Sequence, residues 1–316
     1  MKKQTSGIHH ITAIVGDPQE NIDFYAGVLG LRFVKKTVNF DDPGTYHFYF
    51  GDKAGNPGTI ITFFPWAGAY RGVVGDGQVG VTAYAVPKGA LPFWERRLEK
   101  FNISYTKTKR FNEEVLQFDD PHGLHLELVE REDGKWNEWV IGDITPEVAI
   151  KGFAGATLYS YRPQATAELL EKLMGLEMVG EEKGLIRFRS PAEIGNVIDV
   201  KTNPTGRGMM GVGTVHHIAW RAKDERDQLE WQELVAKSGI GVTDVNDRKY
   251  FQSIYFREYG GILFEIATDP PGFAVDEPPS ELGSKLMLPP WLEPNRETLE
   301  SILPPVKVQV QEGKQS

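Results

Sequence analysis

The sequence predicts an α+β fold in which one βαβββ unit is repeated four times and the copies pair into two domains. Three observations support this prediction. Four β-rich segments open at residues 9–15, 79–86, 153–159 and 216–220, four glycine-led segments close at 58–62, 123–127, 195–199 and 261–265, and an amphipathic stretch follows each opening. A repeat with this spacing indicates a supersecondary unit that buries its apolar face against its copies.

The amphipathic stretches are expected to be helices because their apolar residues recur at i, i+3 and i+4. Gly30, Gly175 and Gly239 follow three of these stretches and suit the left-handed residue that often ends a helix. Short β-rich runs come after each helix and supply the remaining strands of the unit. The expected helices cover residues 21–29, 91–101, 165–174 and 227–237.

A polar segment near residues 131–151 separates the second unit from the third. We therefore predict an N-terminal domain over residues 1–132 and a C-terminal domain over residues 150–270, each with two units. Beyond them the repeat stops and proline pairs become frequent. Residues 271–316 are expected to form an extended proline-rich tail that wraps the body or frays.

The composition excludes several classes of function. A net charge of −9 and a pI near 5.4 argue against a nucleic-acid or anionic-membrane surface. The sequence has no apolar run near the roughly 18 residues that span a bilayer and no signal-peptide pattern at its start, so we expect a cytoplasmic protein. It has no cysteine, so any metal must be held by nitrogen and oxygen. A homo-oligomer is compatible with these features.

Units one and four carry residues that can hold a metal ion. Two imidazoles and one carboxylate with open positions are typical of non-haem Fe(II) oxygenases. Thr62 stands where a fourth ligand would block substrate or dioxygen. The opening position of the four units holds His10, Val81, Gly155 and His217, and the closing position holds Thr62, Glu127, Asp199 and Glu265.

Each of these residues also has an ordinary interpretation. A single histidine near a strand start is more often structural than metal-binding, but two His-His-Ile openings at equivalent positions favour a metal site. Glu265 lies in the apolar run 262–266, where an unpaired carboxylate is costly to bury. We interpret Glu127 and Asp199 as structural or surface-facing, and His47 as structural with a pocket-facing role left open. Neighbouring strand residues point to opposite faces, so one histidine of each pair is the candidate ligand.

The repeat resembles the vicinal oxygen chelate superfamily, which includes glyoxalase I, extradiol dioxygenases and bleomycin resistance proteins. More narrowly, the sequence is similar to the hydroquinone-specific ring-cleaving dioxygenases of bacilli over residues 7 to about 275. The matching stretches are Gly7-Ile-His-His-Ile-Thr12, Arg32-Phe-Val-Lys-Lys-Thr37, Tyr46-His-Phe-Tyr-Phe50, Gly55-Asn-Pro-Gly-Thr59, His216-His-Ile-Ala219, Asp247-Arg248 and Gly260-Gly-Ile-Leu-Phe-Glu265.

This resemblance implies one metal ion between units one and four, held by His10, His217 and Glu265. The ion is expected to be Fe(II), although another divalent metal can replace it in purified protein. The implied reaction is cleavage of a hydroquinone-type or catechol-type ring with O2. The residues implied to support the ligands or to face the substrate are His9, Thr12, His216, Arg248 and Tyr255.

Two rival functions remain open at this point. A glyoxalase-like lyase or isomerase also uses this repeat, but it usually needs a carboxylate where this sequence has Thr62. A resistance protein that only binds a drug or another aromatic ligand needs no metal ligands, so the two His-His openings count against it.

The hairpin at residues 251–257 and 262–267 decides whether Tyr255 can reach the site. Cross-strand partners share one face, and their residue numbers have a constant sum. An odd number of unpaired loop residues places Tyr255 on the face of Glu265, whereas an even number places it with Phe264. The glycines at 260 and 261 suit a three- or five-residue loop. We therefore predict an odd loop and a Tyr255 hydroxyl directed into the pocket.

Overall fold

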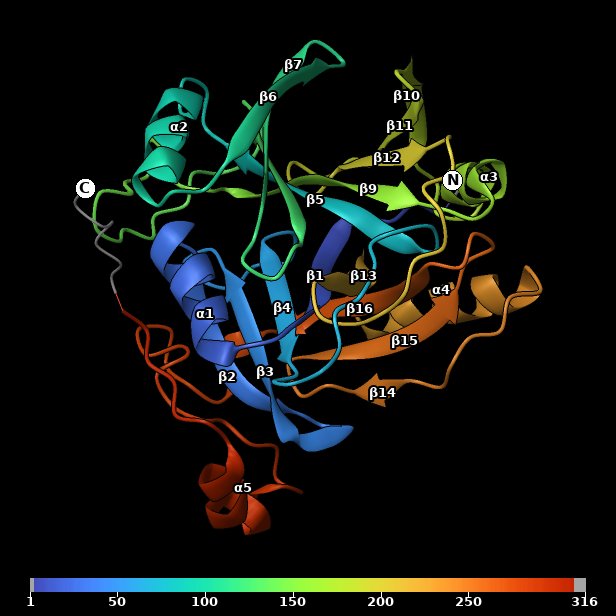
Figure 1. Ribbon diagram of the computed structural model, residues 1–316. Coiled ribbons are helices and arrows are strands. Elements are labelled where there is room, and N and C mark those ends of the chain that lie inside the picture. Colours follow the sequence, from blue (N-terminus) through green and yellow to red (C-terminus); the bar gives the residue numbers. More distant parts are fainter. Residues whose placement is uncertain (1–2, 310–316) are drawn as a thin grey trace.

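The structure of the chain is a computed structural model that describes residues 3–309, and it contains the four predicted βαβββ units (Figure 1). The first unit consists of β1 (Ile8–Val15), α1 (Pro18–Ile22), the π-helix η1 (Asp23–Val28), β2 (Arg32–Asn39), β3 (Asp42–Gly51) and β4 (Ile60–Pro65). The second consists of β5 (Gln78–Val86), α2 (Leu91–Lys100), β6 (Tyr105–Arg110), β7 (Glu113–Asp119) and β8 (His125–Glu130).

The last two units repeat this order. In each of the four units the first strand runs parallel to the last, and the last three strands are antiparallel. The third unit consists of β9 (Gly152–Tyr159), α3 (Pro163–Lys172), β10 (Glu177–Glu182), β11 (Leu185–Arg189) and β12 (Val197–Lys201). The fourth consists of β13 (Thr214–Ala222), α4 (Glu225–Lys237), β14 (Asn246–Asp247), β15 (Phe251–Arg257) and β16 (Leu263–Pro271).

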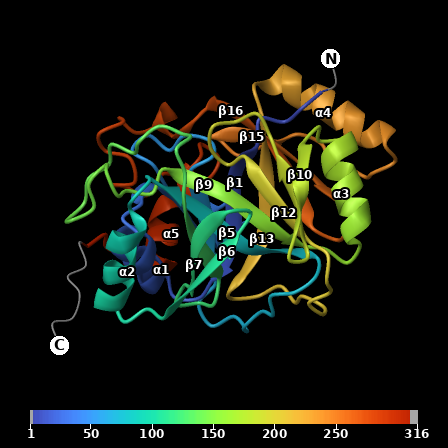
Figure 2. The ribbon, with the colours of Figure 1, turned by 90° about the horizontal axis from the view of Figure 1, so that it is seen from above.

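The units pair into two curled eight-stranded sheets. One has the order β14-β15-β16-β13-β1-β4-β3-β2 and joins units one and four, while the other has the order β10-β11-β12-β9-β5-β8-β7-β6 and joins units two and three. Figure 1 shows the second sheet above the first, and Figure 2 shows α1 and α2 on the side opposite α3 and α4. The predicted boundaries at residues 132 and 150 stay a prediction, and both sheets join strands from either side of them.

Each closing strand begins two residues after the glycine with which the predicted closing segment starts. The glycine lies in the preceding turn and adopts a left-handed conformation, which a side chain would disfavour. The four φ angles lie between +63° and +94°, at Gly58, Gly123, Gly195 and Gly261. Glycine at this offset therefore marks the turn, and the strand starts after it.

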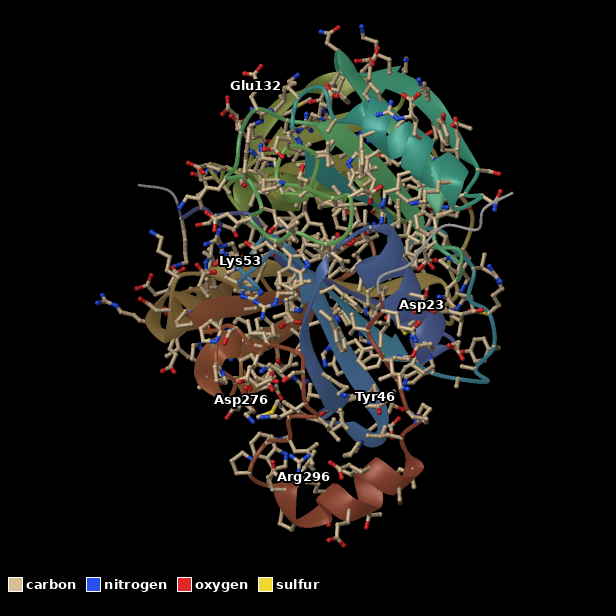
Figure 3. All side chains as sticks on the ribbon, turned by 90° about the vertical axis from the view of Figure 1, so that its left-hand side faces the viewer. Asp23, Tyr46, Lys53, Glu132, Asp276 and Arg296 are labelled. Atoms are coloured by element: carbon tan, nitrogen blue, oxygen red, sulfur yellow. The ribbon has the colours of Figure 1, made fainter. Side chains whose placement is uncertain are left out.

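The C-terminal tail differs in part from the extended segment that was predicted. It contains two short 3-10 helices, η2 (Phe273–Val275) and η3 (Glu293–Asn295), and one α-helix, α5 (Arg296–Ile302). This helix, which carries Arg296, projects beyond the first sheet (Figure 3). The part of the predicted tail after residue 309 lies outside the described residues. Among residues 3–309, no helix is long and apolar enough to cross a membrane.

The start of the tail is fixed against the first sheet by a buried cation. The Lys35 ammonium is fully buried and lies 2.6 Å from an Asp276 oxygen and 2.5 Å from a Glu277 oxygen. Phe273 packs beside them against Tyr49, with ring centroids 5.0 Å apart. A buried lysine needs such partners because an unpaired charge is costly in a protein core.

The second sheet buries the two other acidic closing residues, so the alternative interpretation of Glu127 and Asp199 as surface-facing is wrong. Both are 2% exposed. Arg110 donates to Glu127 at 3.0 Å, and its Nε lies 3.6 Å from Asp199. Arg187 donates to both oxygens of Asp199 at 2.8 Å. Guanidinium groups thus supply the positive charge in the half that lacks the opening histidines.

We predict that Arg110→Met destabilises the protein by about 3–5 kcal/mol, because it leaves buried carboxylates without this partner. Urea unfolding followed by circular dichroism measures the loss. Arg189→Met is the matched control, since Arg189 lies in β11 with an exposed side chain. Equal unfolding midpoints for the two variants would contradict the role of Arg110.

Candidate metal centre

Both His-His pairs lie at β-bulges where β1 meets β13. Ile8 pairs with Trp220 and His10 pairs with Ala219, so His9 is left without a partner between them. The same register shift leaves His216 without a partner between residues 215 and 217. A bulge inserts one extra residue and re-aims the neighbouring side chains. The strict alternation of faces assumed from sequence is therefore interrupted at both pairs.

The bulges bring the two histidines of each pair into contact. The Nδ1 atoms of His9 and His10 are 2.9 Å apart, and those of His216 and His217 are 2.8 Å apart. In each pair the second histidine turns its Nε2 toward the other strand, and the two Nε2 atoms of His10 and His217 lie 3.3 Å apart. The first histidine of each pair thus contacts Nδ1 of the second, on the other side of the ring from Nε2.

Glu265 completes this group from β16. One carboxylate oxygen, Oε2, lies 2.9 Å from His217 Nε2 and 3.4 Å from His10 Nε2. Ligand atoms that share an ion at about 2.1 Å with near-right angles lie about 3 Å apart. Among the described residues, this is the one group of three candidate ligands whose donor atoms all lie within 4.8 Å of one another.

The surroundings of Glu265 fit a cation. Its side chain is fully buried, Oε1 accepts a short hydrogen bond from Ser253, and Oε2 has no hydrogen-bond partner. Although burial raises the pKa of a carboxyl group, the histidines at positions 10 and 217 outweigh that effect and hold the pKa of Glu265 well below its usual range. An ionised oxygen with no donor, beside two imidazole nitrogens, is the donor set of a divalent metal ion.

A backbone carbonyl determines which nitrogen of His10 is free. His9 Nε2 lies 3.1 Å from the carbonyl oxygen of Thr268, which can only accept, so this nitrogen carries the proton. Burial lowers the pKa of His9 well below its usual value, and the imidazole is therefore neutral. Its Nδ1 must then accept from His10 Nδ1, which leaves the lone pair of His10 at Nε2. His9 thus leaves the Nε2 of His10 free to bind a cation.

His216 and His217 have the same arrangement as His9 and His10, but His216 faces a cavity. Burial lowers the pKa of His216 to about 3, so it is neutral near pH 7. When His217 presents the Nε2 lone pair, its Nδ1 donates to His216 Nδ1, and His216 Nε2 keeps a proton. His216 lines the cavity that also contains His217, so this proton is available to a bound molecule.

This cavity has a volume of about 330 Å³ and opens beside the three candidate ligands. Of the predicted supporting residues, the structure places Thr12, His216, Arg248 and Tyr255 in its wall. His9 lies outside the lining and contacts His10 instead. A larger cavity of about 610 Å³ lies in the second sheet beside Glu127, and none of the three candidate ligands lines it. The apolar part of the smaller cavity is formed by Phe40, Phe64, Trp66, Phe251 and Leu263.

The predicted register of the last hairpin is confirmed. Tyr255 pairs with Glu265, and Arg257 pairs with Leu263, so five residues remain in the loop. Tyr255 therefore shares the face of Glu265, and its hydroxyl accepts from Arg248 Nε at 3.3 Å. Arg248 also forms a 3.0 Å ion pair with Asp41 across the cavity. Burial and the nearby carboxylate raise the pKa of Tyr255, so its hydroxyl stays protonated and can donate.

Two residues that the sequence did not single out also support the centre. Ser253 donates to Glu265, and it lies two residues before Tyr255 on the same strand face. Phe251 packs against His10, with ring centroids 4.9 Å apart, and it closes one side of the cavity. Every second residue of a strand lies on the same face, so counting back from Tyr255 would have indicated both Ser253 and Phe251.

Comparisons with known proteins show where the chain belongs. The model of the Glyoxalase/Bleomycin resistance protein/Dioxygenase superfamily matches residues 7–136 and 152–275. "Putative ring-cleaving dioxygenase MhqO" of Bacillus subtilis (strain 168) is 68% identical over 308 residues, covering 98% of this chain and 99% of the relative. "Chlorohydroquinone/hydroquinone 1,2-dioxygenase" of Sphingobium indicum is 34% identical, covering 93% and 94%.

Solved structures show the same relationship. The crystal structure of a "putative dioxygenase" from Bacillus subtilis has a TM-score of 0.97 at 67% identity, covering 97% of this chain and 99% of that one. Glyoxalase I from Zea mays has a TM-score of 0.63 at 14% identity, covering 83% and 92%. The second likeness concerns the fold alone.

We predict that Glu265→Gln abolishes tight binding of divalent metal, because a neutral amide is a weaker ligand for a hard cation. Isothermal calorimetry with Mn²⁺ or anaerobic Fe²⁺ measures the affinity. Glu258→Gln is the matched control, since Glu258 is a buried carboxylate of the same hairpin whose oxygens contact Thr166 and backbone amides. Unchanged affinity in Glu265→Gln would remove this carboxylate from the ligand set.

We also predict that His9→Phe weakens metal binding by about 10- to 100-fold, which is the usual cost of losing the group behind a ligating histidine. The phenyl ring fills the space but cannot accept the proton of His10 Nδ1. The same calorimetry applies, with the exposed His125→Gln as control. If His9→Phe binds as tightly as His125→Gln, the tautomer argument is wrong.

Proposed function

The chain belongs to the glyoxalase/bleomycin resistance protein/dioxygenase superfamily, and we propose that it is an Fe(II)-dependent ring-cleaving dioxygenase acting on hydroquinone-type aromatic compounds. It is an enzyme of the oxidoreductase class that incorporates both atoms of O2. The observation that carries the proposal is the convergence of His10, His217 and Glu265 beside a cavity with aromatic walls. The names of the relatives from Bacillus and Sphingobium support the same reaction.

His10, His217 and Glu265 would hold the iron, and Thr62 leaves the fourth place without a ligand. The Thr62 hydroxyl is engaged by Thr12 at 2.9 Å and by His47 at 2.8 Å. Two imidazoles and one carboxylate leave about three positions for small molecules. When bound, the ion supplies activation of O2 and acidifies the substrate hydroxyl that it contacts.

The residues around the cavity orient the ring and stabilise its charge. A hydroquinone cannot chelate through adjacent oxygens, because its second hydroxyl lies across the ring. Arg248 and Tyr255 therefore donate to the substrate oxygen as it becomes negative, and this kind of preorganised donor is a large source of catalysis. His216 Nε2–H adds a third donor. The volume of about 330 Å³ is at the lower end for ligand sites and suits a single ring with small substituents.

Thr62 also distinguishes the proposal from its main rival. A glyoxalase-like lyase usually has a carboxylate as fourth ligand, whereas here an uncharged hydroxyl occupies that place and is bound to other side chains. A protein that only sequesters aromatic compounds does not need the buried carboxylate and its two imidazoles. The dioxygenase accounts for both features.

We predict that protein loaded anaerobically with Fe²⁺ consumes one O2 per hydroquinone and does not convert methylglyoxal with glutathione. An oxygen electrode and ultraviolet absorbance of the ring-opened product follow the first reaction, and absorbance of the thioester follows the second. Turnover of methylglyoxal without oxygen uptake would favour the lyase.

In the same assay, Tyr255→Phe should lower kcat by about 100-fold, the usual effect of removing one donor to a developing oxyanion. Tyr259→Phe is the matched control, because Tyr259 lies in the turn of the same hairpin and is 47% exposed. Equal kcat for the two variants would show that Tyr255 does not contact the reacting oxygen.

A further inference from the structure

A chain of hydrogen bonds runs along the cavity wall opposite Glu265. Tyr49 Oη lies 2.9 Å from His47 Nδ1, and His47 Nε2 lies 2.8 Å from Thr62 Oγ1. Thr62 Oγ1 in turn lies 2.9 Å from Thr12 Oγ1. Both threonines are fully buried, and Thr12 lines the cavity beside His10. The chain therefore starts where a substrate hydroxyl would lie and continues into the protein.

The repeat shows that Thr62, in this chain of hydrogen bonds, occupies the position in unit one that Glu265 occupies in unit four. In unit four, Tyr255 pairs with Glu265, and in unit one Tyr49 pairs with Thr62. Two residues earlier on each strand, Ser253 donates to Glu265, and His47 contacts Thr62. The geometry is thus retained, but a hydroxyl replaces the carboxylate and an imidazole replaces the serine. The strand pair that supplies a candidate metal ligand in unit four therefore supplies groups that can exchange protons in unit one.

Every member of the chain can both donate and accept. In one arrangement Thr12 donates to Thr62, Thr62 donates to His47 Nε2, and His47 Nδ1–H donates to Tyr49 Oη. The opposite arrangement reverses each bond. Burial lowers the pKa of His47 well below its usual value, so its imidazole is neutral at rest. A neutral imidazole can accept one proton for a short time and must return it.

We propose that Thr12, Thr62 and His47 form a proton relay that takes up the proton of the substrate hydroxyl and gives it back to the product. This inference rests on the proposed function. The substrate O–H proton moves to Thr12 Oγ1 while the Thr12 proton moves to Thr62 and the Thr62 proton moves to His47 Nε2. The substrate oxygen becomes negative and His47 becomes an imidazolium. The reverse shift returns one proton to the ring-opened product, and no electrons pass along the chain.

The relay predicts a dependence on substrate acidity that a structural role would not produce. Thr62→Val keeps the shape of the side chain but interrupts the relay, and Thr62→Ser keeps the hydroxyl. Loss of acid–base catalysis usually costs 10²–10⁴-fold, and with partial replacement by water we expect kcat to fall by about 10- to 100-fold. The loss should be largest with methylhydroquinone and should shrink with the more acidic chlorohydroquinones. Thr62→Ser and wild type should agree within about twofold, with equal KM and metal content throughout.

A binding measurement tests the relay without turnover. Under nitrogen, the ultraviolet difference spectrum of 2-chlorohydroquinone on metal-loaded protein reports whether the bound hydroxyl is ionised. We expect Thr62→Val and His47→Gln to raise the pKa of the bound probe by about one unit, which is a tenfold change in ionisation. Circular dichroism and metal analysis confirm that each variant is folded and loaded.

The outcomes separate the relay from the proposed function. Equal ionisation and equal dependence on substrate acidity in wild type and Thr62→Val would overturn the relay and leave the dioxygenase intact. A wild type that ionises the probe but takes up no oxygen would overturn the dioxygenase, and the variants would still decide the relay. A wild type that neither binds the probe nor takes up oxygen would overturn both.

Discussion

A carboxylate and two imidazoles buried together need a positive charge between them, because one oxygen of the carboxylate has no hydrogen-bond donor. Glu265 is fully buried and one of its oxygens has no hydrogen bond, so the first sheet has a place for a cation. The second sheet has the same strand order and also buries two carboxylates, but Arg110 and Arg187 provide the charge. The source of positive charge thus distinguishes the half that contains the candidate metal centre from the half in which arginines pair with the buried carboxylates.

Much of the fold could be predicted because its signals are local. The glycine-led closing segments, the amphipathic helices and the paired histidines recur at fixed offsets, so the four units were visible in the sequence. The same repeat aligned His10 with His217 and Thr62 with Glu265, and the structure brings His10, His217 and Glu265 together. The register of the last hairpin also followed from the length of its loop.

Other features depend on contacts between distant strands and could not be predicted. The bulges at His9 and His216 arise from the pairing of β1 with β13, two strands that lie far apart in the sequence. The arginine partners of Glu127 and Asp199 lie on other strands of the second sheet, so the sequence alone does not indicate that these carboxylates are buried. Helix α5 lies in a segment rich in proline, and its seven residues are too few for a helical pattern to stand out against that composition. The role of His47 depends on its contact with Thr62 on the next strand, which the sequence alone does not indicate.

The pairing of the first unit with the last has a consequence for how the protein is made. The strands β1 and β13 meet at the centre of the first sheet, whereas the complete second sheet lies between them in the chain. During synthesis at about 5–20 residues per second, β1 leaves the ribosome roughly 10–40 s before β13 can pair with it. Its apolar residues and unpaired backbone must be protected during that time. The first sheet is therefore completed last, after every strand of the second sheet has been synthesised, so a nascent chain cut short before residue 265 carries the two histidines without Glu265.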